Sequence, residues 1–564
     1  MKVFTSALIF CILGIFPLAA GGGRQTTPQR PANSAAIVTT PGQLPVVNQP
    51  LTLTLGIQQS PNVNDYDDTY FTRYMERKTG IKINFQMFSN VASDSNTQFE
   101  LMVSSNERLP DIMNFSVEGW ENYGANGVFI DLNPLYEKYA YFYNVGLDEG
   151  GLDAAGKKLV ENRTTAPDGG RYAWPTIETN GVNIFYGMNF INQVWLNNLG
   201  LRMPTTTEEF YNILVAFRDR DPNRNGQRDE IPWIGSTGVW SGQPLHFIIN
   251  AFVYYPITGL NEAYLNATNG RLWTPWTTEE YRQALRYLNR LFNEGLLSPS
   301  IFTITQQELV AITSYQSGEV NRVGFFSGGP TVLLVPETPA IYDYTNQVSL
   351  TGPNGVNYYS KRPEITVQPR MFITRDCYYP EAAFRWMDTL HDIDTTMTIR
   401  YGEKDVDWRW VSPGEGLVNQ YGLPAEFLEI STIWGVPQNK HWSVANGITI
   451  RPNSASNFLQ GGRAIEGGTW NADRWKLMEN LPINDGKDVP EKVIHISYTR
   501  AEEDSIREIR NSINTYREEC LALFCTGEMS LDRDWNTYLS TLDRIGLQRY
   551  LQTAQTAYTR TMSR

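Results

Sequence analysis

The stretch LTLTLGIQQSPNVNDYDDTYFTRYMERKTGIKINFQMF (Leu51–Phe88) carries the pattern that decides the fold class. Leu51–Ile57 alternates apolar and polar side chains, as a half-buried β-strand does. Asp68–Thr79 predicts a helix, and Ile81–Phe88 predicts a second strand. A strand, a helix and a strand at this spacing form a parallel β-α-β unit. A helix around Thr97–Ser105 continues the alternation, so we expect an α/β fold.

The chain is long and acidic. Its 564 residues are too many for one hydrophobic core, which predicts at least two domains. Hydrophobic residues at 41% and charged residues at 19% are typical of an ordinary soluble globular protein. The formal net charge of -13 argues against a nucleic-acid-binding surface, which would need clustered Lys and Arg side chains.

The N-terminus has the features of a secretory signal peptide. Lys2 opens it, Phe4–Ala19 form an apolar run, and the small residues Ala19–Gly21 suit cleavage. We therefore expect residues 1–21 to be removed and the mature protein to be periplasmic or secreted. The alternative is an uncleaved N-terminal anchor. Residues 22–50 are rich in Gly, Thr, Pro, Asn and Gln, which predicts a disordered linker.

Three cysteines remain after cleavage, namely Cys377, Cys520 and Cys525. Cys520 and Cys525 lie five residues apart on a predicted helix, which places them about 140° apart around its axis, a poor geometry for a disulfide. We expect buried thiols that serve packing. The four histidines are scattered singly along the chain, so they predict no Cys/His metal site.

A second short stretch, DPNRNGQRDEIP (Asp221–Pro232), has the pattern of a calcium-binding loop. Ca²⁺ prefers several oxygen ligands at once, and oxygen-bearing side chains recur here at alternate positions. Gly226 stands where a tight loop needs a residue without a Cβ, whereas Pro232 occupies the position of the bidentate Glu in an EF-hand. We predict a structural Ca²⁺ site, the alternative being a solvated turn. Its ligands are Asp221, Asn223, Asn225, the backbone carbonyl of Gln227, Asp229 and Glu230.

Several segments in a fixed order resemble one family, the bacterial extracellular solute-binding proteins of family 1. WLNNLGLRMPTTTEEFYNILVAFRDRDPNRNGQRDEIP (Trp195–Pro232) is similar to the alginate- and oligosaccharide-binding branch, whose members carry a calcium loop of this spacing. RYAWPTIETNGVNIFYGMNFINQVWL (Arg171–Leu196) follows the family's YALP…lyiNkdwL pattern, with Trp174 in place of the usual Leu. Further similar segments are Asp111–Leu135, Phe372–Asp392, Tyr401–Trp408 and the closing helices up to Tyr558.

The resemblance implies two α/β lobes of a type II-like periplasmic-binding-protein fold, with crossing strands at a hinge and a ligand cleft between the lobes. It assigns residues 51–176 and 367–440 to the first lobe. Residues 177–366 and 441–564 would form the second lobe, which carries the calcium loop at 221–230. The implied crossings lie near Pro175–Asn180, Val367–Phe372 and Lys440–Ser443.

The resemblance also bears on lipidation. Many members of the family are lipoproteins whose first mature residue is Cys. Gly21, Gly22 and Gly23 stand where that Cys would be expected, and Cys11 lies too deep in the apolar run to replace it. This departure argues against a lipid anchor.

Tryptophans in loop-like segments that are rich in Gly and Pro are candidates for the ligand site. Sugars present apolar C–H faces edged by hydroxyls, so their sites pair flat aromatic rings with hydrogen-bonding side chains. Packing in the core is the alternative for each ring. Because lobe crossings form the floor of the cleft, Trp174, Glu178 and Trp120 are the first candidates. The others are Trp408, Trp240, Trp434 and Trp470.

Together these features predict a monomeric solute-binding protein that captures an oligosaccharide and delivers it to the permease subunits of an ABC importer by hinge closure. The sequence has no nucleophile elbow, no zinc-binding histidine motif and no nucleotide-binding loop, so we expect no catalysis. A secreted carbohydrate-active enzyme, a glycosidase or a lyase, is the alternative, because glycoside hydrolysis needs only two carboxylates. A binding protein for peptides is the third possibility.

Overall fold

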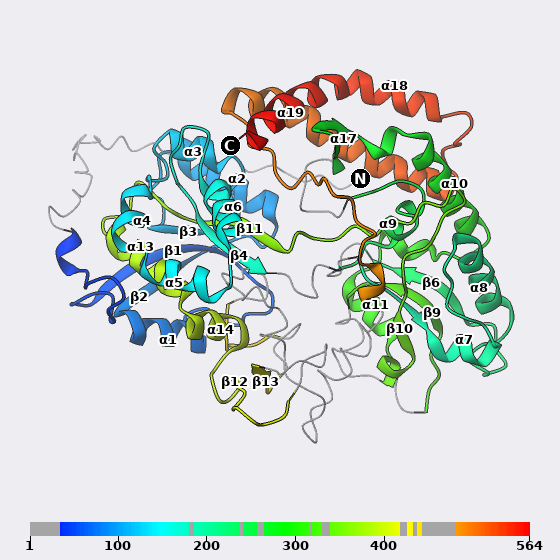
Figure 1. Ribbon diagram of the computed structural model, residues 1–564, viewed down its shortest axis with the longest axis horizontal. Helices are drawn as coiled ribbons and strands as arrows, with labels where there is room; N and C mark the ends of the chain where they lie inside the picture. The colour runs from blue at the N-terminus through cyan, green and yellow to red at the C-terminus, as the bar shows by residue number, and fades with distance from the viewer. Residues whose placement is uncertain are drawn as a thin grey trace, which may run out of the picture.

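The computed structural model contains two lobes, each built on its own mixed β-sheet with helices packed around it (Figure 1). This arrangement confirms the predicted α/β class. The structure describes residues 34–179, 185, 187–236, 241–256, 264–315, 318–329, 339–417, 426–431, 437–442 and 481–563. The predicted signal peptide, residues 1–21, and residues 22–33 of the predicted linker lie outside the described residues.

The first sheet draws its strands from three separate parts of the chain. They are β1 (Leu51–Gln58), β2 (Ile81–Phe88), β3 (Ile112–Asn114), β4 (Trp174–Thr179) and β11 (Ile365–Ile373). The strand order is β2-β1-β3-β11-β4, in which β1 runs parallel to β2 and β3, and β11 runs antiparallel to β3 and β4.

The helix between β1 and β2, α1 (Tyr70–Thr79), has clear local signals at both ends. The Thr69 hydroxyl accepts the N–H of Thr72 and so caps the amino end. Gly80 ends the helix with a φ of 73°, a conformation that a residue without a Cβ adopts easily. The predicted β-α-β unit is thereby confirmed.

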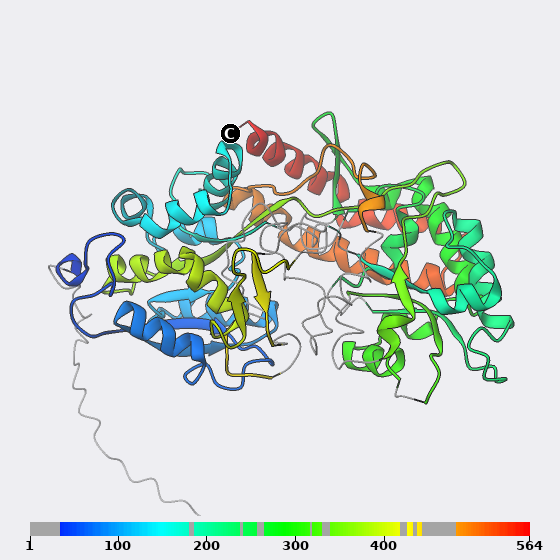
Figure 2. The same ribbon diagram turned by 60° about the horizontal axis from the view of Figure 1, so that its bottom comes forward.

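Helices surround the first sheet and bury one face of each helix against it (Figure 1). They are α2 (Ala92–Ser104), α3 (Trp120–Ala125), α4 (Asn133–Tyr139), α5 (Tyr141–Glu149), α6 (Ala154–Thr164), α13 (Pro380–Asp388), η7 (Thr389–His391) and α14 (Ile393–Tyr401). Two short antiparallel strands, β12 (Trp408–Trp410) and β13 (Phe427–Glu429), form a separate ladder beside α14 (Figure 2). The main core joins residues of the sheet to α13, for example Leu55 to Phe384.

The second lobe is built on a four-stranded sheet. Its strands are β5 (Asn189–Asn192), β6 (Ile231–Gly235), β9 (Val323–Ser327) and β10 (Tyr344–Asn346). They lie in the order β10-β5-β9-β6, with β6 and β9 parallel. A separate hairpin pairs β7 (Asn266–Thr268) with β8 (Arg271–Trp273). The helices of this part of the second lobe are α7 (Gln193–Leu199), α8 (Thr207–Asp219), α9 (Pro244–Ile249), η4 (Pro275–Thr277), α10 (Glu279–Asn293), η5 (Pro299–Phe302), α11 (Gln306–Thr313) and η6 (Pro339–Tyr342).

The C-terminal part of the chain covers the second lobe. After η8 (Leu481–Asn484) it forms three helices, α17 (Arg500–Thr526), α18 (Trp535–Ile545) and α19 (Leu547–Met562). Buried residues of these helices belong to the main core of the second lobe. The amino end of the long helix α17 extends beyond that lobe and lies beside α2 and α3 of the first lobe (Figures 1 and 2).

Three connections join the lobes, and they differ in part from the predicted crossings. The first follows β4, and the second lies between Tyr359, which packs in the second lobe, and the start of β11. The third lies between Trp442 and η8, outside the described residues. Val367–Phe372 is therefore no crossing, because these residues form strand β11 of the first sheet. Trp442 packs in the first-lobe core, with its ring centroid 5.0 Å from that of Phe71, although residues 441–564 were predicted for the second lobe.

The prediction of a disordered linker is wrong for residues 34–50. Val46 is fully buried, and the Arg385 guanidinium of α13 donates to the carbonyls of Thr39 at 2.6 Å and Gln43 at 2.9 Å. The Ser34 hydroxyl donates to Glu381 at 2.8 Å. Composition gave no sign of this order, because the partners of the segment are far away in the sequence.

Cys377, Cys520 and Cys525 are free and buried, which confirms the prediction of thiols that serve packing. In the described part of the chain, no helix combines the length and the apolar character that a membrane span requires.

Candidate functional site

The edge at which the parallel strands of the first sheet end forms one half of the candidate site. Open α/β sheets bind ligands outside the carboxyl ends of their strands. Glu178 on β4 and Arg370 on β11 lie half-buried at this edge. Arg370 Nη1 donates to the Ser116 hydroxyl at 3.1 Å. Burial lowers the pKa of Arg370 to about 10, while the Glu178 carboxylate acts in the opposite direction. A guanidinium and a carboxylate together offer donors and acceptors to a polar ligand.

Two buried polar side chains at the same edge have no hydrogen-bond partner in the structure. They are Asn114, at the end of β3, of which neither amide atom is bonded, and Thr176, whose hydroxyl is unbonded. An unpartnered buried polar group costs about 1–3 kcal/mol, so a protein keeps few of them without a reason such as a bound water or ligand. The loop after β3 is held nearby, because Asn96 donates to the Ser116 carbonyl at 3.3 Å.

Trp174, the first predicted platform, lies in the core of the first lobe and not on a surface. Its ring is fully buried and stacks on Tyr136, with 5.4 Å between centroids and 10° between planes. Phe384 and His391 pack edge-on against it at 5.2 and 5.0 Å. The reason is that Trp174 begins a strand, so its side chain alternates into the helical layer and packs there. In this conformation the ring has no face on which a sugar could stack.

Trp120 and Trp408 also serve packing. Trp120 opens α3 and is only 7% exposed, with its ring centroid 6.3 Å from that of Phe372. Trp408 is fully buried in β12, and its Nε1 donates to the Gly402 carbonyl at 3.0 Å. Of the predicted ligand residues that the structure describes, Glu178 alone lies at the ligand edge with part of its side chain exposed. Trp240, Trp434 and Trp470 lie outside the described residues.

The matching edge of the second sheet is lined by short polar side chains. Strand β9 ends at Ser327, whose hydroxyl donates to Asn189 at 2.6 Å and accepts Trp233 Nε1 at 3.3 Å. Ser241 Oγ accepts the N–H groups of the two residues before Asn189 at 2.9 and 3.1 Å. The second sheet thus presents a rigid, hydrogen-bonded edge.

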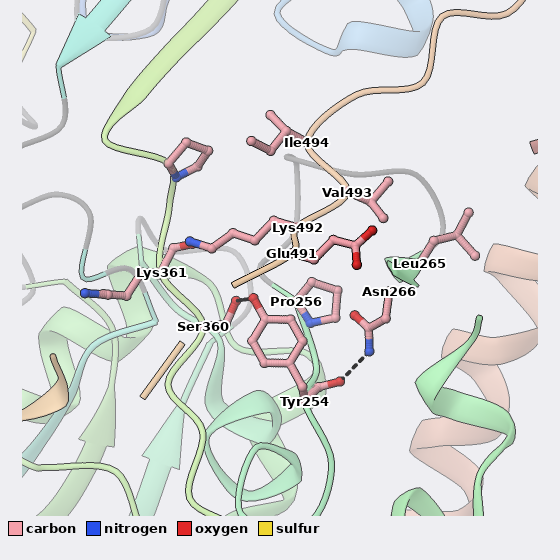
Figure 3. A pocket seen from close by; sticks show the side chains of 11 residues that line it. Tyr254, Pro256, Leu265, Asn266, Ser360, Lys361, Glu491, Lys492, Val493 and Ile494 are labelled. Carbon is pink, nitrogen blue, oxygen red and sulfur yellow. Dashed lines mark hydrogen bonds between the residues drawn. The ribbon is translucent and has the colours of Figure 1, made fainter. Parts of the chain in front are cut away.

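A pocket lies in the second lobe, between the second connection and the segment that leads from η8 to α17 (Figure 3). Its walls include Tyr254, Lys361 and Lys492. The Tyr254 hydroxyl donates to Asp488 at 3.0 Å and lies 3.1 Å from the Ser360 hydroxyl. The Lys361 N–H also donates to Asp488, at 3.3 Å, and the Lys492 amino group donates to the Lys361 carbonyl at 3.1 Å. These contacts fasten the second connection to the second lobe, so the pocket belongs to the hinge.

The predicted calcium loop folds as a tight turn after α8. The backbone N–H groups of Asn225 and Gly226 each donate to the Asp221 carboxylate at 3.1 Å, and Gln227 N–H donates to Asn225 Oδ1 at 2.7 Å. Gly226 has a φ of 74°, as its predicted role requires. The loop therefore points side-chain oxygens at its own centre, as cation-binding loops do.

The donor set of this loop fits a calcium ion. Glu230 has a buried oxygen, Oε1, without a hydrogen-bond partner, and burial together with the charges of Asp229 and Asp221 raises the pKa of its carboxyl. The side-chain amides of Asn223 and Asn225 donate to Asp229 at 3.2 and 3.0 Å, and rotation of either amide would exchange its NH₂ group for an oxygen.

Acidic side chains alone would not hold a metal at this loop. Among the described residues, no three His, Cys, Asp or Glu side chains gather closely enough to bind a metal ion. Any cation here would therefore depend on the Asn oxygens and the Gln227 carbonyl as well, as in other calcium loops.

Sequence reasoning missed three residues of the first-lobe edge, namely Asn114, Thr176 and Arg370. Each lies on a strand that reads as an ordinary buried strand, and β11 joins the sheet from a distant part of the chain. Their position in the strands was the available signal, because polar residues at the carboxyl ends of strands in an α/β sheet are candidates for ligand binding.

Comparisons with known proteins agree with this architecture. The family model described as bacterial extracellular solute-binding protein matches residues 60–391. The fructooligosaccharide ABC transporter substrate-binding protein FusA of Streptococcus pneumoniae serotype 4 is 24% identical over 577 residues, which cover 99% of this chain and 98% of FusA. A structure of the FusA EF-hand mutant with fructo-nystose matches with a TM-score of 0.65 and 20% identity, covering 91% of this chain and 99% of that one.

Two further structures share the fold. An HMO-binding, ABC-transporter-associated solute-binding protein from Bifidobacterium longum infantis has a TM-score of 0.68 at 19% identity and covers 91% of this chain and 99% of that one. The alginate-binding protein AlgQ2, solved without calcium ion, has a TM-score of 0.64 at 20% identity with the same coverage. Because the family model matches more than half of its residues, this chain belongs to the bacterial extracellular solute-binding proteins.

Proposed function

We propose that this protein captures an oligosaccharide between its two lobes and delivers it to the permease subunits of an ABC importer. The observation that carries the proposal is the match to FusA over nearly the whole of both chains. FusA is named for fructooligosaccharides, and the relatives that share the fold are named for other glycans. Membership of a solute-binding family makes this a binding protein and not an enzyme.

The two sheet edges supply the chemistry that such a ligand needs. On the first lobe, Glu178 and Arg370 offer an acceptor and donors that suit vicinal hydroxyls. On the second lobe, Ser327 and Asn189 hold a rigid polar edge in place. We expect the sugar to bind to one lobe first and to recruit the other, with bending at the three connections. Closure would then present a surface of both lobes to the permease.

Calcium is part of the proposal as a structural ion. Asp221, Asn223, Asn225, Asp229 and Glu230 would hold it with the carbonyl of Gln227. The ion would supply positive charge that relieves the repulsion among the three carboxylates and fixes the turn after α8. Support comes from the unpartnered Glu230 oxygen and from the relatives whose descriptions mention an EF-hand or calcium.

We further propose that residues 1–21 direct export and are cleaved, so that the mature protein acts as a monomer in the periplasm or outside the cell. The apolar run after Lys2 supports this, and so does the extracellular character of the family. The N-terminal sequence of the exported protein tests it. A start at or near residue 22 is expected, and an intact Met1 in the exported protein would contradict cleavage.

The proposed function is tested by a thermal-shift screen of the mature protein against fructo-oligosaccharides, alginate oligosaccharides and peptides, followed by calorimetry of each hit. We expect a sugar to raise the melting temperature and to be recovered intact in mass spectrometry. Recovery of a cleaved sugar would favour a glycosidase or lyase instead. Stabilisation by peptides alone would replace the carbohydrate with a peptide ligand.

A further inference from the structure

Solvent access separates the tryptophans of this chain into two groups. Sugar stacking needs an indole with an exposed face, and most of the rings that the structure describes are buried in the cores. Within the described ranges, the half-buried tryptophans are Trp410 in the first lobe and Trp273 in the second. Trp273 lies in the β7–β8 hairpin, which packs against α19 and away from the sheet edges. Trp410 therefore remains as the tryptophan with access to solvent in the first lobe.

Strand β12, which carries Trp410, is anchored at the ligand edge of the first sheet. Asp407, just before β12, forms an ion pair with Lys440. Two residues before Lys440, Gln438 bridges to Val63, in the loop that follows the carboxyl end of β1. In Figure 2 the yellow strands β12 and β13 lie on the side of the first lobe that faces the second, and in Figure 1 they lie at its lower end, below α14. The ladder thus lies next to the strand ends at which α/β sheets bind ligands.

The indole of Trp410 is held in a fixed orientation. Its Nε1 donates to Asp394 of α14 at 3.1 Å. The ring of Trp408 packs edge-on against it, with 5.3 Å between centroids and 89° between planes. Lys404 donates to the same Asp394 at 2.9 Å and so holds that carboxylate in place. A ring fixed in this way loses little conformational freedom when a ligand stacks on it.

An ion pair on the opposite face of β12 holds the backbone that carries the ring. Arg409 donates to Glu415 at 3.0 Å, and the same nitrogen donates to the Trp410 carbonyl at 3.1 Å. The Arg409 side chain and the Ser412 N–H lower the pKa of the Glu415 carboxyl to about 2, so it stays charged at neutral pH. The two side chains lie 28% and 30% exposed, within reach of solvent. The pair thus fixes the backbone on either side of Trp410, through the Trp410 carbonyl and the Ser412 N–H.

We propose that Trp410 is a stacking platform for one sugar ring of the bound oligosaccharide. The inference rests on the proposed function and specifies the part of the first lobe that contacts the ligand. It replaces Trp408, which the sequence pattern favoured, with its neighbour two residues later on the same strand.

The test compares Trp410→Ala, Trp410→Phe and Trp273→Ala in calorimetric titrations with fructo-nystose and with an alginate tetrasaccharide. Trp410→Ala should weaken binding at least tenfold, because the apolar face is lost. Trp410→Phe keeps a ring and should stay within about threefold of the wild type. Trp273→Ala removes an equally half-buried indole away from the edge and should bind like the wild type. Equal affinity of Trp410→Ala and wild type would overturn the platform.

A second readout keeps the inference testable if Trp410→Ala folds poorly. In protein that contains 5-fluorotryptophan, the resonance missing from Trp410→Phe identifies Trp410. It should shift when sugar is added, while the Trp273 resonance should not. A Trp410 resonance that stays in place during saturation would contradict the platform. Failure of the wild type to bind either sugar would count against the proposed function itself, which separates the two results.

Discussion

The two lobes satisfy a buried charged side chain in different ways, as Asp388 in the first lobe and Arg517 in the second show. In the first lobe, the Asp388 carboxylate accepts backbone N–H groups of the first three residues of α5, at 2.8 to 3.3 Å. In the second lobe, Arg517 is 2% exposed, and it donates to the Tyr255 hydroxyl at 2.5 Å and lies over the Tyr264 ring at 4.1 Å. Its carboxylate partner, Glu518, is 65% exposed. One charge is thus met by backbone donors and the other by aromatic rings.

The difference teaches which property of each side chain matters. Asp388 must carry oxygens in a fixed place, because the amino end of a helix offers directed donors. Arg517 fills space among tyrosines and has no buried acid to neutralise it, so its volume should matter more than its charge. Burial also keeps a histidine neutral in each lobe, because it lowers the pKa of His391 in the first lobe and of His246 in the second to about 3.

The largest expected effect separates volume from charge at Arg517. Arg517→Ala leaves a cavity and an unpartnered Tyr255 hydroxyl, so it should destabilise the second lobe by about 4 kcal/mol. Arg517→Met keeps most of the volume and should cost less than about 1 kcal/mol. Urea unfolding with fluorescence detection measures both. Arg507→Ala, on the same helix but 44% exposed, is the control and should leave stability unchanged.

Asp388→Asn gives the opposite result in the first lobe if the comparison holds. An amide keeps one acceptor oxygen and places its NH₂ group against at least one of the three backbone donors. We expect a loss of about 2 kcal/mol although the volume is the same. Equal tolerance of Asp388→Asn and Arg517→Met would show that the two lobes do not differ in this respect.

Calcium removal should sharpen the contrast between the lobes by acting on one of them. At a free concentration of about 100 times Kd, a bound ion stabilises the folded state by about 3 kcal/mol. EGTA should therefore lower the melting temperature of the wild type, whereas Asp221→Ala with Asp229→Ala should start lower and not respond. Asp219→Ala, just before the loop, is the control. Hydrogen exchange should rise in the second lobe alone, and an unchanged response to EGTA in the double variant would refute the site.

Acid should weaken the second lobe more than the first. Burial lowers the pKa of His246 and of His391 to about 3. Below pH 6.5 these histidines are therefore protonated in the unfolded chain but not in the folded one. Burial raises the pKa of Asp388 from 3.8 to about 6, so there the folded chain takes the proton first. On going from pH 7 to pH 5, each histidine should lower the free energy of unfolding by about 2 kcal/mol. Asp388 should raise that of the first lobe by about 1 kcal/mol.

Hydrogen exchange measured lobe by lobe at pH 7 and pH 5 checks this difference. The second lobe should lose protection by the full amount and the first lobe by roughly half as much. His246→Phe should flatten the pH dependence of the second lobe and leave that of the first unchanged. Equal acid sensitivity of both lobes would contradict the compensation by Asp388.

The fold followed from the sequence because its signals are local. The alternation in β1, the cap at Thr69 and the glycine at the end of α1 are readable within about one turn of where they act. The N-terminal segment was misjudged for the opposite reason. Its order depends on contacts with Arg385 and Glu381, and the composition of residues 34–50 does not predict partners that are so distant in the sequence.

The candidate site was predicted less well than the fold. The calcium loop is one continuous stretch, and its geometry fits the prediction, as the turn at Gly226 shows. Trp174, Trp120 and Trp408 were wrong as platforms, because a tryptophan beside Gly or Pro looks exposed in a sequence, while packing partners far away in the chain decide whether it is buried. Trp408 and Trp410 show this on one face of the same strand: the first is fully buried, and the second is half-buried.

The smallest effect concerns the hinge, where hydrogen bonds of the second lobe hold the second connection. Tyr254→Phe removes the hydroxyl that lies between Asp488 and Ser360, at a cost of about 1 kcal/mol. Hydrogen exchange should rise at 359–363 and 487–492, and sugar affinity should change because the connections bend more freely. Tyr211→Phe removes a hydroxyl bonded to Glu294 at 2.6 Å in the same lobe but away from the connections, so it should alter stability without altering affinity. If both variants change affinity alike, the hydrogen bonds that hold the second connection do not control lobe closure. The hinge would then lie on the first-lobe side.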